Sequence, residues 1–208
     1  MASKQVHQKL SHEEHVLQLP DTYIGDTEKN TCDFWCYNPE TKLMENKPLT
    51  YIPGEYKLYD EILVNAFDQY IRTSESKDTK LSPVKNIKIN VDQKSGLISV
   101  YNDGEGIPIE IHPKEKIYIP ELIFGELLTS SNYDKDEIKH VGGKNGYGAK
   151  LANIFSVKFT ITTVDKNKNK KFSMSFYDNK TRKDKPTITK YTSKPFTQID
   201  YIPDFKRF

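Results

Sequence analysis

A polar stripe within one amphipathic segment most constrains how this chain can fold. Between residues 56 and 72, Glu61, Asn65, Asp68 and Arg72 follow one another at spacings of four, three and four residues. At about 100° per residue, these side chains fall within roughly 60° of arc on a helix. The pattern predicts a long helix whose polar stripe is either ordinary surface or one wall of a site. The residues expected to pack on its other side are Tyr59, Ile62, Leu63, Ala66, Phe67 and Tyr70.

The rest of the chain contains patterns of short helices and strands. The capping box Ser11–Glu14 predicts a helix to about Gln18, and Pro53–Gly54 is expected to break the chain before the long helix. Alternating apolar residues predict a half-buried strand over 84–91. This order favours an α+β, two-layer α/β sandwich over a doubly wound parallel sheet, with helices on one face of a mixed, mostly antiparallel sheet. Further strands are expected at 34–37, 49–52, 97–101, 157–164, 172–177, 187–191 and 197–202, and further helices at 121–128 and 148–155.

Composition argues against several other classes of protein. The net charge of +2 over 208 residues gives no basic footprint of a dedicated nucleic-acid binder, and the lysine-rich tract 166–171 is expected to be a solvated turn. The sequence has neither an apolar run of about 18 residues nor a hydrophobic signal core in residues 1–10, so we expect neither membrane insertion nor secretion. Cys32 and Cys36 are too few for a disulfide framework or a four-ligand zinc site, which favours an intracellular, reducing compartment.

The first of two glycine-rich loops, residues 102–108, follows the strand expected at 97–101. Its sequence Asn-Asp-Gly-Glu-Gly-Ile-Pro places the carboxylate of Asp103 beside two glycines, where a flat ligand can approach the backbone. A carboxylate is a suitable acceptor for an adenine amino group. The same residues also suit a plain turn, so the residues alone leave both interpretations open.

The second glycine-rich loop contains four glycines within residues 142–148 and runs directly into an expected helix. Glycines let the backbone approach a phosphate closely, a helix N-terminus offers free N–H groups, and Lys144 and Lys150 add positive charge. The loop lacks the Walker pattern, and Leu151 stands where the third glycine of the dinucleotide fingerprint belongs. It is therefore either a phosphate-binding loop of another type or a mobile surface loop.

The polar stripe supplies residue types that nucleotide hydrolysis requires. Glu61 is a candidate general base for a water that attacks a γ-phosphate. Asn65, one turn further along, offers a neutral oxygen for Mg²⁺, which keeps phosphates and waters among its ligands. The joint occurrence of this stripe and the two loops predicts an ATP site built without a P-loop.

Three short motifs together resemble those of the Bergerat-type (GHKL) ATPases. They are Glu61-x-x-x-Asn65, Asp103-Gly104-x-Gly106 and Gly142-Gly143-x-Asn145-Gly146-x-Gly148. Longer strings resemble the N-terminal ATPase domain of eukaryotic-type type IIA DNA topoisomerases, and this resemblance runs from about His7 to the end of the chain. The strings are Pro20–Gly25, Tyr59–Ala66, Leu127–Tyr133 and Gly142–Lys150.

The resemblance implies a role for each matching residue. Glu61 would activate the attacking water, Asn65 would bind Mg²⁺, and Asp103 would recognise the adenine amino group. The other implied ATP contacts are Asp68 and Arg72 on the same wall, Gly106, Ile107, Ile123, Phe124 and Thr197 around the base, Ser130, Ser131 and Asn132 at the ribose and phosphates, and Gly143, Lys144, Asn145, Gly146, Tyr147, Gly148, Ala149 and Lys150 in the phosphate loop.

The resemblance also implies a place in a larger enzyme. Residues 1–25 would be an N-terminal strap and residues 26–208 the ATP-binding domain, while the switch lysine of the transducer domain and the DNA-cleaving residues would lie beyond this chain. ATP would drive homodimerisation that closes a gate on a DNA segment, in the nucleus of a eukaryote or at a viral replication site in the cytoplasm. We expect the chain alone to bind ATP but turn it over weakly. Leu19 and His7 depart from the Arg and Tyr usual in relatives.

Three other interpretations predict different behaviour. A nucleotide-sensing dimerisation module would bind ATP without hydrolysing it. A DNA-binding domain would depend on the tract 166–171, which the near-neutral charge disfavours. A chaperone or histidine-kinase ATPase would share the three motifs, but the strings at 20–25 and 127–133 argue against that membership.

Overall fold

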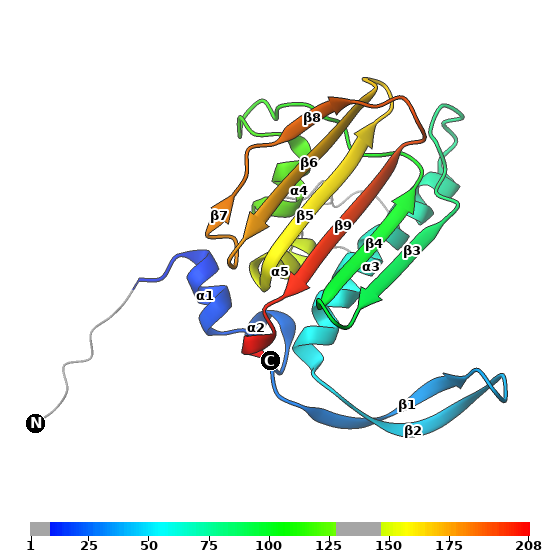
Figure 1. Ribbon diagram of the computed structural model, residues 1–208, viewed down its shortest axis with the longest axis vertical. Coiled ribbons are helices and arrows are strands. Elements are labelled where there is room, and N and C mark those ends of the chain that lie inside the picture. The colour runs from blue at the N-terminus through cyan, green and yellow to red at the C-terminus, as the bar shows by residue number, and fades with distance from the viewer. Residues whose placement is uncertain (1–8, 128–146) are drawn as a thin grey trace, which may run out of the picture.

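An antiparallel sheet of seven strands forms one layer of the computed structural model, which describes residues 9–127 and 147–208. The strand order is β3–β4–β9–β5–β6–β7, with β8 also paired to β6 (Figure 1). The strands are β3 (Ile87–Asp92), β4 (Leu97–Asp103), β5 (Ser156–Asp165), β6 (Lys170–Tyr177), β7 (Arg182–Lys183), β8 (Thr187–Lys190) and β9 (Phe196–Pro203).

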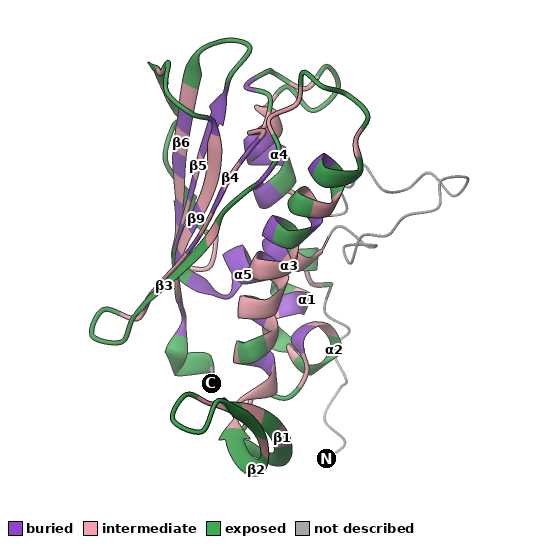
Figure 2. Ribbon diagram, turned by 90° about the vertical axis from the view of Figure 1, so that its right-hand side faces the viewer, coloured by how far each residue is buried: buried purple, intermediate pink, exposed green. Residues whose placement is uncertain are grey.

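The strand pairing confirms most of the predicted architecture and corrects one part of it. Every ladder among the described residues is antiparallel, so the expectation of a mixed sheet was wrong. The physical reason lies in the connections: β3–β4 and β5–β6 are hairpins, and β9 returns between β4 and β5 without a parallel crossover. The two-layer sandwich with helices on one face is confirmed (Figure 2).

Five helices form the second layer against one face of this sheet. They are α1 (His12–Gln18), α2 (Asp21–Ile24), α3 (Pro53–Glu75), α4 (Ile119–Gly125) and α5 (Gly148–Ile154), and a short 3₁₀ helix, η1 (Phe205–Arg207), lies near the C-terminus. The predicted capping box begins α1, because Ser11 and Glu14 each bond the other's backbone N–H. Within the described ranges, no helix is both long and apolar enough to cross a bilayer.

Large aromatic side chains fill the space between the two layers. Phe155, Phe159, Phe172, Phe176 and Tyr201 are each at most 1% exposed. They pack against apolar residues of α3 and α5, among them Leu58, Ile62 and Ile154. Burial of this much apolar surface fixes α3 and α5 against the sheet.

The long helix α3 begins earlier than predicted, and its buried face is centred on different residues from those predicted. Pro53 occupies the first turn, where its missing N–H costs nothing, so the expected break before the helix was wrong. Leu58, Ile62 and Ala66 are buried, whereas Phe67 is 52% exposed although it was expected in the core. Tyr70 is also exposed, at 40%. The buried stripe follows a spacing of four residues, and Phe67 lies about 140° around the helix from Ile62.

The edge strand β3 is much more exposed than its alternating pattern predicts. Only Ile87 packs against the core, while Ile89 and Val91 are 45% and 55% exposed. All three point to the helix face, because Ile89 pairs with the buried Val100. The prediction of a half-buried strand was wrong for its outer half, since β3 is the edge strand and α3 packs on its neighbour β4.

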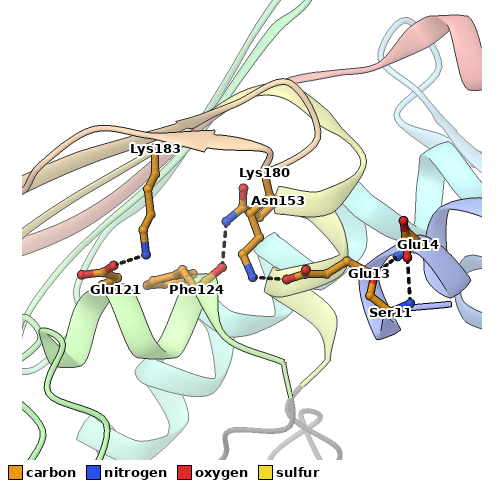
Figure 3. Close-up of polar contacts among 8 residues, drawn as sticks. All are labelled: Ser11, Glu13, Glu14, Glu121, Phe124, Asn153, Lys180 and Lys183. Atoms are coloured by element: carbon orange, nitrogen blue, oxygen red, sulfur yellow. Dashed lines mark hydrogen bonds and ion pairs between the residues drawn. The ribbon is translucent and has the colours of Figure 1, made fainter. Parts of the chain in front are cut away.

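Polar contacts tie the helices to the far edge of the sheet (Figure 3). Lys183 of β7 bonds Glu121 of α4 at 2.8 Å, and Lys180 of the turn before β7 bonds Glu13 of α1 at 2.6 Å. Asn153 of α5 donates to the backbone oxygen of Phe124 at 3.0 Å. The two-residue strand β7, which the sequence pattern did not predict, therefore anchors α4, and the turn before it anchors α1.

A two-stranded hairpin, β1 (Asn30–Asn38) with β2 (Leu43–Tyr51), projects away from both layers (Figures 1 and 2). This confirms the predicted hairpin, with longer strands than expected. Trp35 and Tyr37 are 67% and 59% exposed, and both cysteines lie on β1. The hairpin contributes little to the core.

Candidate functional site

A pocket of about 990 Å³ lies between α3 and the sheet, bounded also by α4, α5 and the loop after β4. Its floor is apolar and is continuous with the hydrophobic core around Ile62. Polar and charged side chains line its walls, so the pocket offers both apolar contact and polar groups that can orient a ligand. The apolar lining residues include Ile62, Ala66, Val100, Ile107, Ile119, Ile123, Phe124 and Ile199.

The polar stripe of α3 forms one wall of this pocket. Glu61, Asn65, Asp68 and Arg72 all line it, as the interpretation of the stripe as a site wall predicts. Their position follows from the orientation of α3. Because the buried face of the helix is centred near Ile62, the polar stripe faces along the sheet toward the cavity. Asp68 is 7% exposed and therefore belongs to the interior rather than the surface.

The carboxylate of Glu61 is held between two neighbours. Lys57 Nζ lies 2.5 Å from Glu61 Oε1, and hydrogen bonding to Glu61 is the main reason why the pKa of Lys57 lies above its ordinary value. On the other side, a Cβ placed on Gly148 would come within 1.7 Å of Glu61 Oε2. Position 148 must therefore be a glycine if the carboxylate is to keep this place.

Asn65 presents one side-chain oxygen toward the cavity. Its Nδ2 donates to the backbone oxygen of Glu61, which leaves Oδ1 available as a hard-cation ligand. The described residues contain no group of three or more His, Cys, Asp or Glu side chains arranged to hold a metal. A Mg²⁺ ion here would therefore take most of its ligands from phosphates and water, which suits its usual chemistry.

Asp103 does not face the pocket, so the expectation that it lies beside a bound base was wrong. Its Oδ1 accepts hydrogen bonds from the backbone N–H groups of Lys85 and Asn86 at 2.7 and 2.8 Å, and its Oδ2 accepts one from Asn86 Nδ2. Desolvation acts to raise the pKa of Asp103, but the bonds from Asn86 and Lys85 together hold it below its ordinary value. Asp103 therefore stabilises the turn before β3.

Its neighbour Asn102 lines the pocket instead. Successive residues of a strand point to opposite faces, and Asn102 shares the face of the buried Val100. The Asn102 side chain is 5% exposed overall, and its Nδ2 donates to the backbone oxygen of Asp103 at 3.0 Å. The Oδ1 acceptor is then available to a ligand.

Hydrogen bonds between neighbouring strands shape the same end of the pocket. Thr197 of β9 bonds Thr163 of β5 through their hydroxyl oxygens at 2.9 Å, and Thr163 Oγ1 also accepts from the N–H of Ile107 at 3.0 Å. Gly106 lies against β5 so closely that a Cβ would meet Val164 O at 1.9 Å. Gly106, Ile107 and Thr197 all line the pocket, as expected for residues around a base.

The opposite end of the pocket is formed by the start of α5. Tyr147, Gly148, Ala149 and Lys150 line it, while Ile123 and Phe124 of α4 close the side between the two ends. Lys150 is 4% exposed, and desolvation, followed by repulsion from Lys180, lowers its pKa to about 8. A buried cation at this end favours an anionic ligand group.

Several predicted contacts lie outside the described residues, so the structure does not place them. They are His7, Ser130, Ser131, Asn132, Gly143, Lys144, Asn145 and Gly146.

The sequence interpretation missed several polar residues that line the pocket, among them Lys57, Asn102 and Tyr23. Lys57 could have been found from its spacing of four residues before Glu61. Asn102 could have been found because it continues the apolar alternation of Ile98 and Val100. Tyr23 of α2 had no comparable signal, because it reaches the pocket from a helix at the other end of the chain.

Curated relatives of this chain are DNA topoisomerases 2. Those of Acanthamoeba polyphaga mimivirus and Candida albicans are each 49% identical over 207 residues, covering 97% and 99% of this chain. The protein of Caenorhabditis elegans is 47% identical over 209 residues, or 100% of this chain. The chain spans only 16%, 14% and 13% of these three proteins. No protein-family model matches it.

Solved structures show the same likeness in three dimensions. The ATPase region of Saccharomyces cerevisiae topoisomerase II superposes with a TM-score of 0.90 at 47% identity, over 97% of this chain and 51% of that one. The ATPase and transducer domains of Balamuthia mandrillaris topoisomerase II give 0.91 at 41%, over 100% and 52%.

A more distant structure shares the fold alone. The ATPase domain of Thermus thermophilus gyrase B gives a TM-score of 0.65 at 20% identity, over 94% of this chain and 40% of that one. The nearer likenesses extend over almost every residue of this chain, in sequence as well as in fold. The chain therefore belongs to the family of DNA topoisomerase II ATPase regions, which have the GHKL-type fold.

Proposed function

We propose that this chain binds ATP in the pocket beneath α3 and hydrolyses it as the ATPase part of a type II DNA topoisomerase. The observation that carries the proposal is the placement of two kinds of group at opposite ends of one cavity. Glu61, Asn65 and the buried Lys150 lie at one end, which suits a triphosphate. Asn102 and Thr197 lie at the other end above an apolar floor, which suits a base.

Recognition of the base would depend on the end built by β4, β5 and β9. The Oδ1 of Asn102 would accept a hydrogen bond from the adenine amino group, taking the role that the resemblance assigned to Asp103. Gly106, Ile107, Ile123, Phe124 and Thr197 would surround the ring. Ser130, Ser131 and Asn132, together with Gly143–Gly146, remain proposed contacts to the ribose and phosphates.

Hydrolysis would depend on the end built by α3 and α5. Glu61 would orient a water and accept its proton as the water attacks the γ-phosphate, with Lys57 and Gly148 fixing the direction of the carboxylate. Lys150 would place positive charge beside the phosphates. When bound, Mg²⁺ would be held by Asn65 with phosphate and water oxygens, and would offset the negative charge of the phosphates.

In the whole protein, we propose that ATP binding joins two copies of this region and closes a gate on a DNA segment. The fold and sequence relatives support this proposal, because their names are those of DNA topoisomerases 2 and of topoisomerase II ATPase regions. Residues 1–25 would then act as an arm and residues 26–208 as the ATP-binding domain. The protein would work in the nucleus of a eukaryote, or at a replication site in the cytoplasm if viral.

The lysine-rich tract 166–171 gives little support to a separate DNA-binding function. Lys168 pairs with Glu110 at 2.8 Å, and Lys166 donates to Ser82 Oγ at 3.1 Å. Both ammonium groups therefore already have partners, Glu110 and Ser82, outside the tract.

The substitution Glu61→Gln tests the proposed hydrolysis directly. It keeps the shape of the side chain but removes the base, so ATP turnover should fall by about 10²–10⁴-fold while affinity for a non-hydrolysable ATP analogue stays nearly constant. Phosphate release and calorimetric titration measure the two quantities, and Glu75→Gln, at the exposed end of the same helix, is the matched control. Unchanged turnover in Glu61→Gln would remove Glu61 as the base, and analogue binding by a wild type without turnover would favour a nucleotide sensor. Absence of analogue binding by the wild type would remove the ATP site.

A further inference from the structure

We propose that the N-terminal helices α1 and α2 position the phosphate end of the nucleotide site, with Tyr23 as the positioning residue that holds Tyr147. This inference deepens the proposed function and rests on it. It assigns a role to a cluster of four rings, His12, His15, Tyr23 and Tyr147, which the mechanism above does not use. We call this group the ring cluster.

The ring cluster joins two segments that lie far apart in the sequence. Tyr147, the residue immediately before α5, lies edge-on to His12 with ring centroids 5.8 Å apart. It also packs against Tyr23 at 6.4 Å with an interplanar angle of 44°. Edge-to-face and tilted pairs at these separations are favourable for aromatic rings. The rings of α1 and α2 therefore contact the exact junction where α5 begins.

Tyr23 is itself held in a single orientation. Its hydroxyl lies 2.9 Å from His15 Nδ1, and the two rings meet edge to face at 85° with centroids 5.8 Å apart. Tyr23 also lines the pocket, as does the preceding Thr22. A hydrogen bond and three ring contacts, to His12, His15 and Tyr147, fix this side chain between α1 and Tyr147, so it can transmit the position of one to the other.

The helix that carries the two histidines is anchored to the body independently of these rings. Val16 is fully buried, and Glu13 bonds Lys180 at 2.6 Å in the turn before β7 (Figure 3). The capping box of Ser11 and Glu14 fixes the first turn of α1. Ile24, the last residue of α2, is only 3% exposed. The helices that carry the other rings are therefore fixed to the rest of the chain, and the ring contacts hold Tyr147 to them.

The position of Tyr147 determines that of the groups next to it. Gly148 follows directly and lies against the carboxylate of Glu61, where even a Cβ would not fit. Lys150 is two residues further on and lines the same end of the pocket. Displacement of Tyr147 would shift this end relative to Glu61, whereas Asn102 belongs to β4 and would not move. The ring cluster should therefore affect phosphate binding and leave base binding unchanged.

Two ligands that differ only in their phosphates separate this role from general support of the fold. We would titrate Tyr23→Ala and Tyr23→Phe with a non-hydrolysable ATP analogue and with adenosine, and use Tyr37→Ala on the exposed hairpin as the matched control. Tyr23→Ala should weaken analogue binding about 10-fold and adenosine binding by less than about 2-fold. Tyr23→Phe keeps the ring and should lose about 3-fold on the analogue alone.

The outcomes distinguish this inference from the function on which it rests. Equal weakening of both ligands by Tyr23→Ala, or no effect on either, overturns the positioning role and leaves the ATP site intact. If the wild type binds neither ligand, the proposed function fails and the inference fails with it. His12→Ala removes an exposed ring that touches Tyr147, so it tests the same contact if Tyr23→Ala does not fold. It should also weaken analogue binding selectively.

Discussion

The two ends of the pocket are built from different kinds of contact. At the sheet end, Asn102, Gly106 and Thr197 are placed by strand pairing, and their neighbours are backbone atoms and buried hydroxyls. At the helix end, Glu61 and Lys150 are placed by contacts between side chains, including the pair with Lys57 and the ring cluster. The sheet end is built on paired strands, while the helix end is assembled from side chains of α3 and α5.

This difference predicts how each end responds to substitution. A change at the sheet end must disturb strand register or close backbone packing, so stability and binding should fall together. A change at the helix end moves side chains that can relax, so chemistry should fail while the fold survives. The comparison would be wrong if substitutions at the sheet end abolished activity without lowering stability, or if substitutions at the helix end unfolded the chain.

The largest contrast is expected between Gly106→Ala and Gly148→Ala. At position 106 the new methyl group meets the backbone oxygen of Val164 at 1.9 Å, which cannot move aside, so unfolding free energy should drop by about 3 kcal/mol. At position 148 it meets the end of the Glu61 side chain, which can turn away. Stability should then change by less than about 1 kcal/mol, while turnover falls about 100-fold. Urea titration and phosphate release measure the two effects, and equal destabilisation would contradict the comparison.

A smaller contrast is expected between adjacent residues of β4. Asn102→Ala removes an acceptor that faces the pocket and should weaken adenosine binding about 10-fold. Asp103→Asn disturbs the bonds to Lys85 and Asn86 and should cost about 1 kcal/mol of stability without changing affinity. Calorimetry with adenosine checks both variants. If only the Asp103 variant lost affinity, the base would lie on the other side of the strand.

The charge on Lys150 should make phosphate binding depend on pH. Burial lowers its pKa to about 8, so the ammonium group loses its proton as pH rises through that value. Because a folded-state pKa below the ordinary 10.5 disfavours the charged form, the free chain should gain stability as pH rises through about 8. Affinity for the ATP analogue should fall about 10-fold over the same range, and adenosine affinity should not. Lys150→Met should abolish the pH dependence of analogue binding.

The smallest effect is expected at Lys57, which is partly exposed. Lys57→Met removes the ion pair with Glu61, and an exposed pair of this kind is worth about 0.2–1 kcal/mol. Turnover should fall by about 3-fold, with unchanged affinity and stability, and Lys57→Arg should restore it. A loss as large as that of Glu61→Gln would show that Lys57 does more than orient the carboxylate.

Much of the fold was predictable because the decisive patterns are local. The capping box of α1 and the amphipathic face of α3 each depend on neighbouring residues. Exposure of Phe67 and Val91 was not predictable, because amphipathic periodicity does not say where the second layer ends. Phe67 of α3 is 52% exposed, and Val91 of the edge strand β3 is 55% exposed.

Site residues were predictable where a sequence motif indicates a specific chemical role. They were not predictable where strand register determines which side chain faces the pocket. Asn102 and Asp103 are both polar and adjacent, and only the pairing of β4 with β9 decides which one faces the cavity. Tyr23 and Tyr147 meet through tertiary packing alone, and no local pattern relates them.

The close fit of Gly148 against Glu61 constrains how this sequence can vary. The two positions belong to separate motifs, but the Glu61 carboxylate occupies the space that a side chain at position 148 would need. A side chain at 148 would force the Glu61 carboxylate out of this place, so the chain would fold but lose the proposed base. The double variant Glu61→Gly with Gly148→Ala should likewise fold normally without turnover.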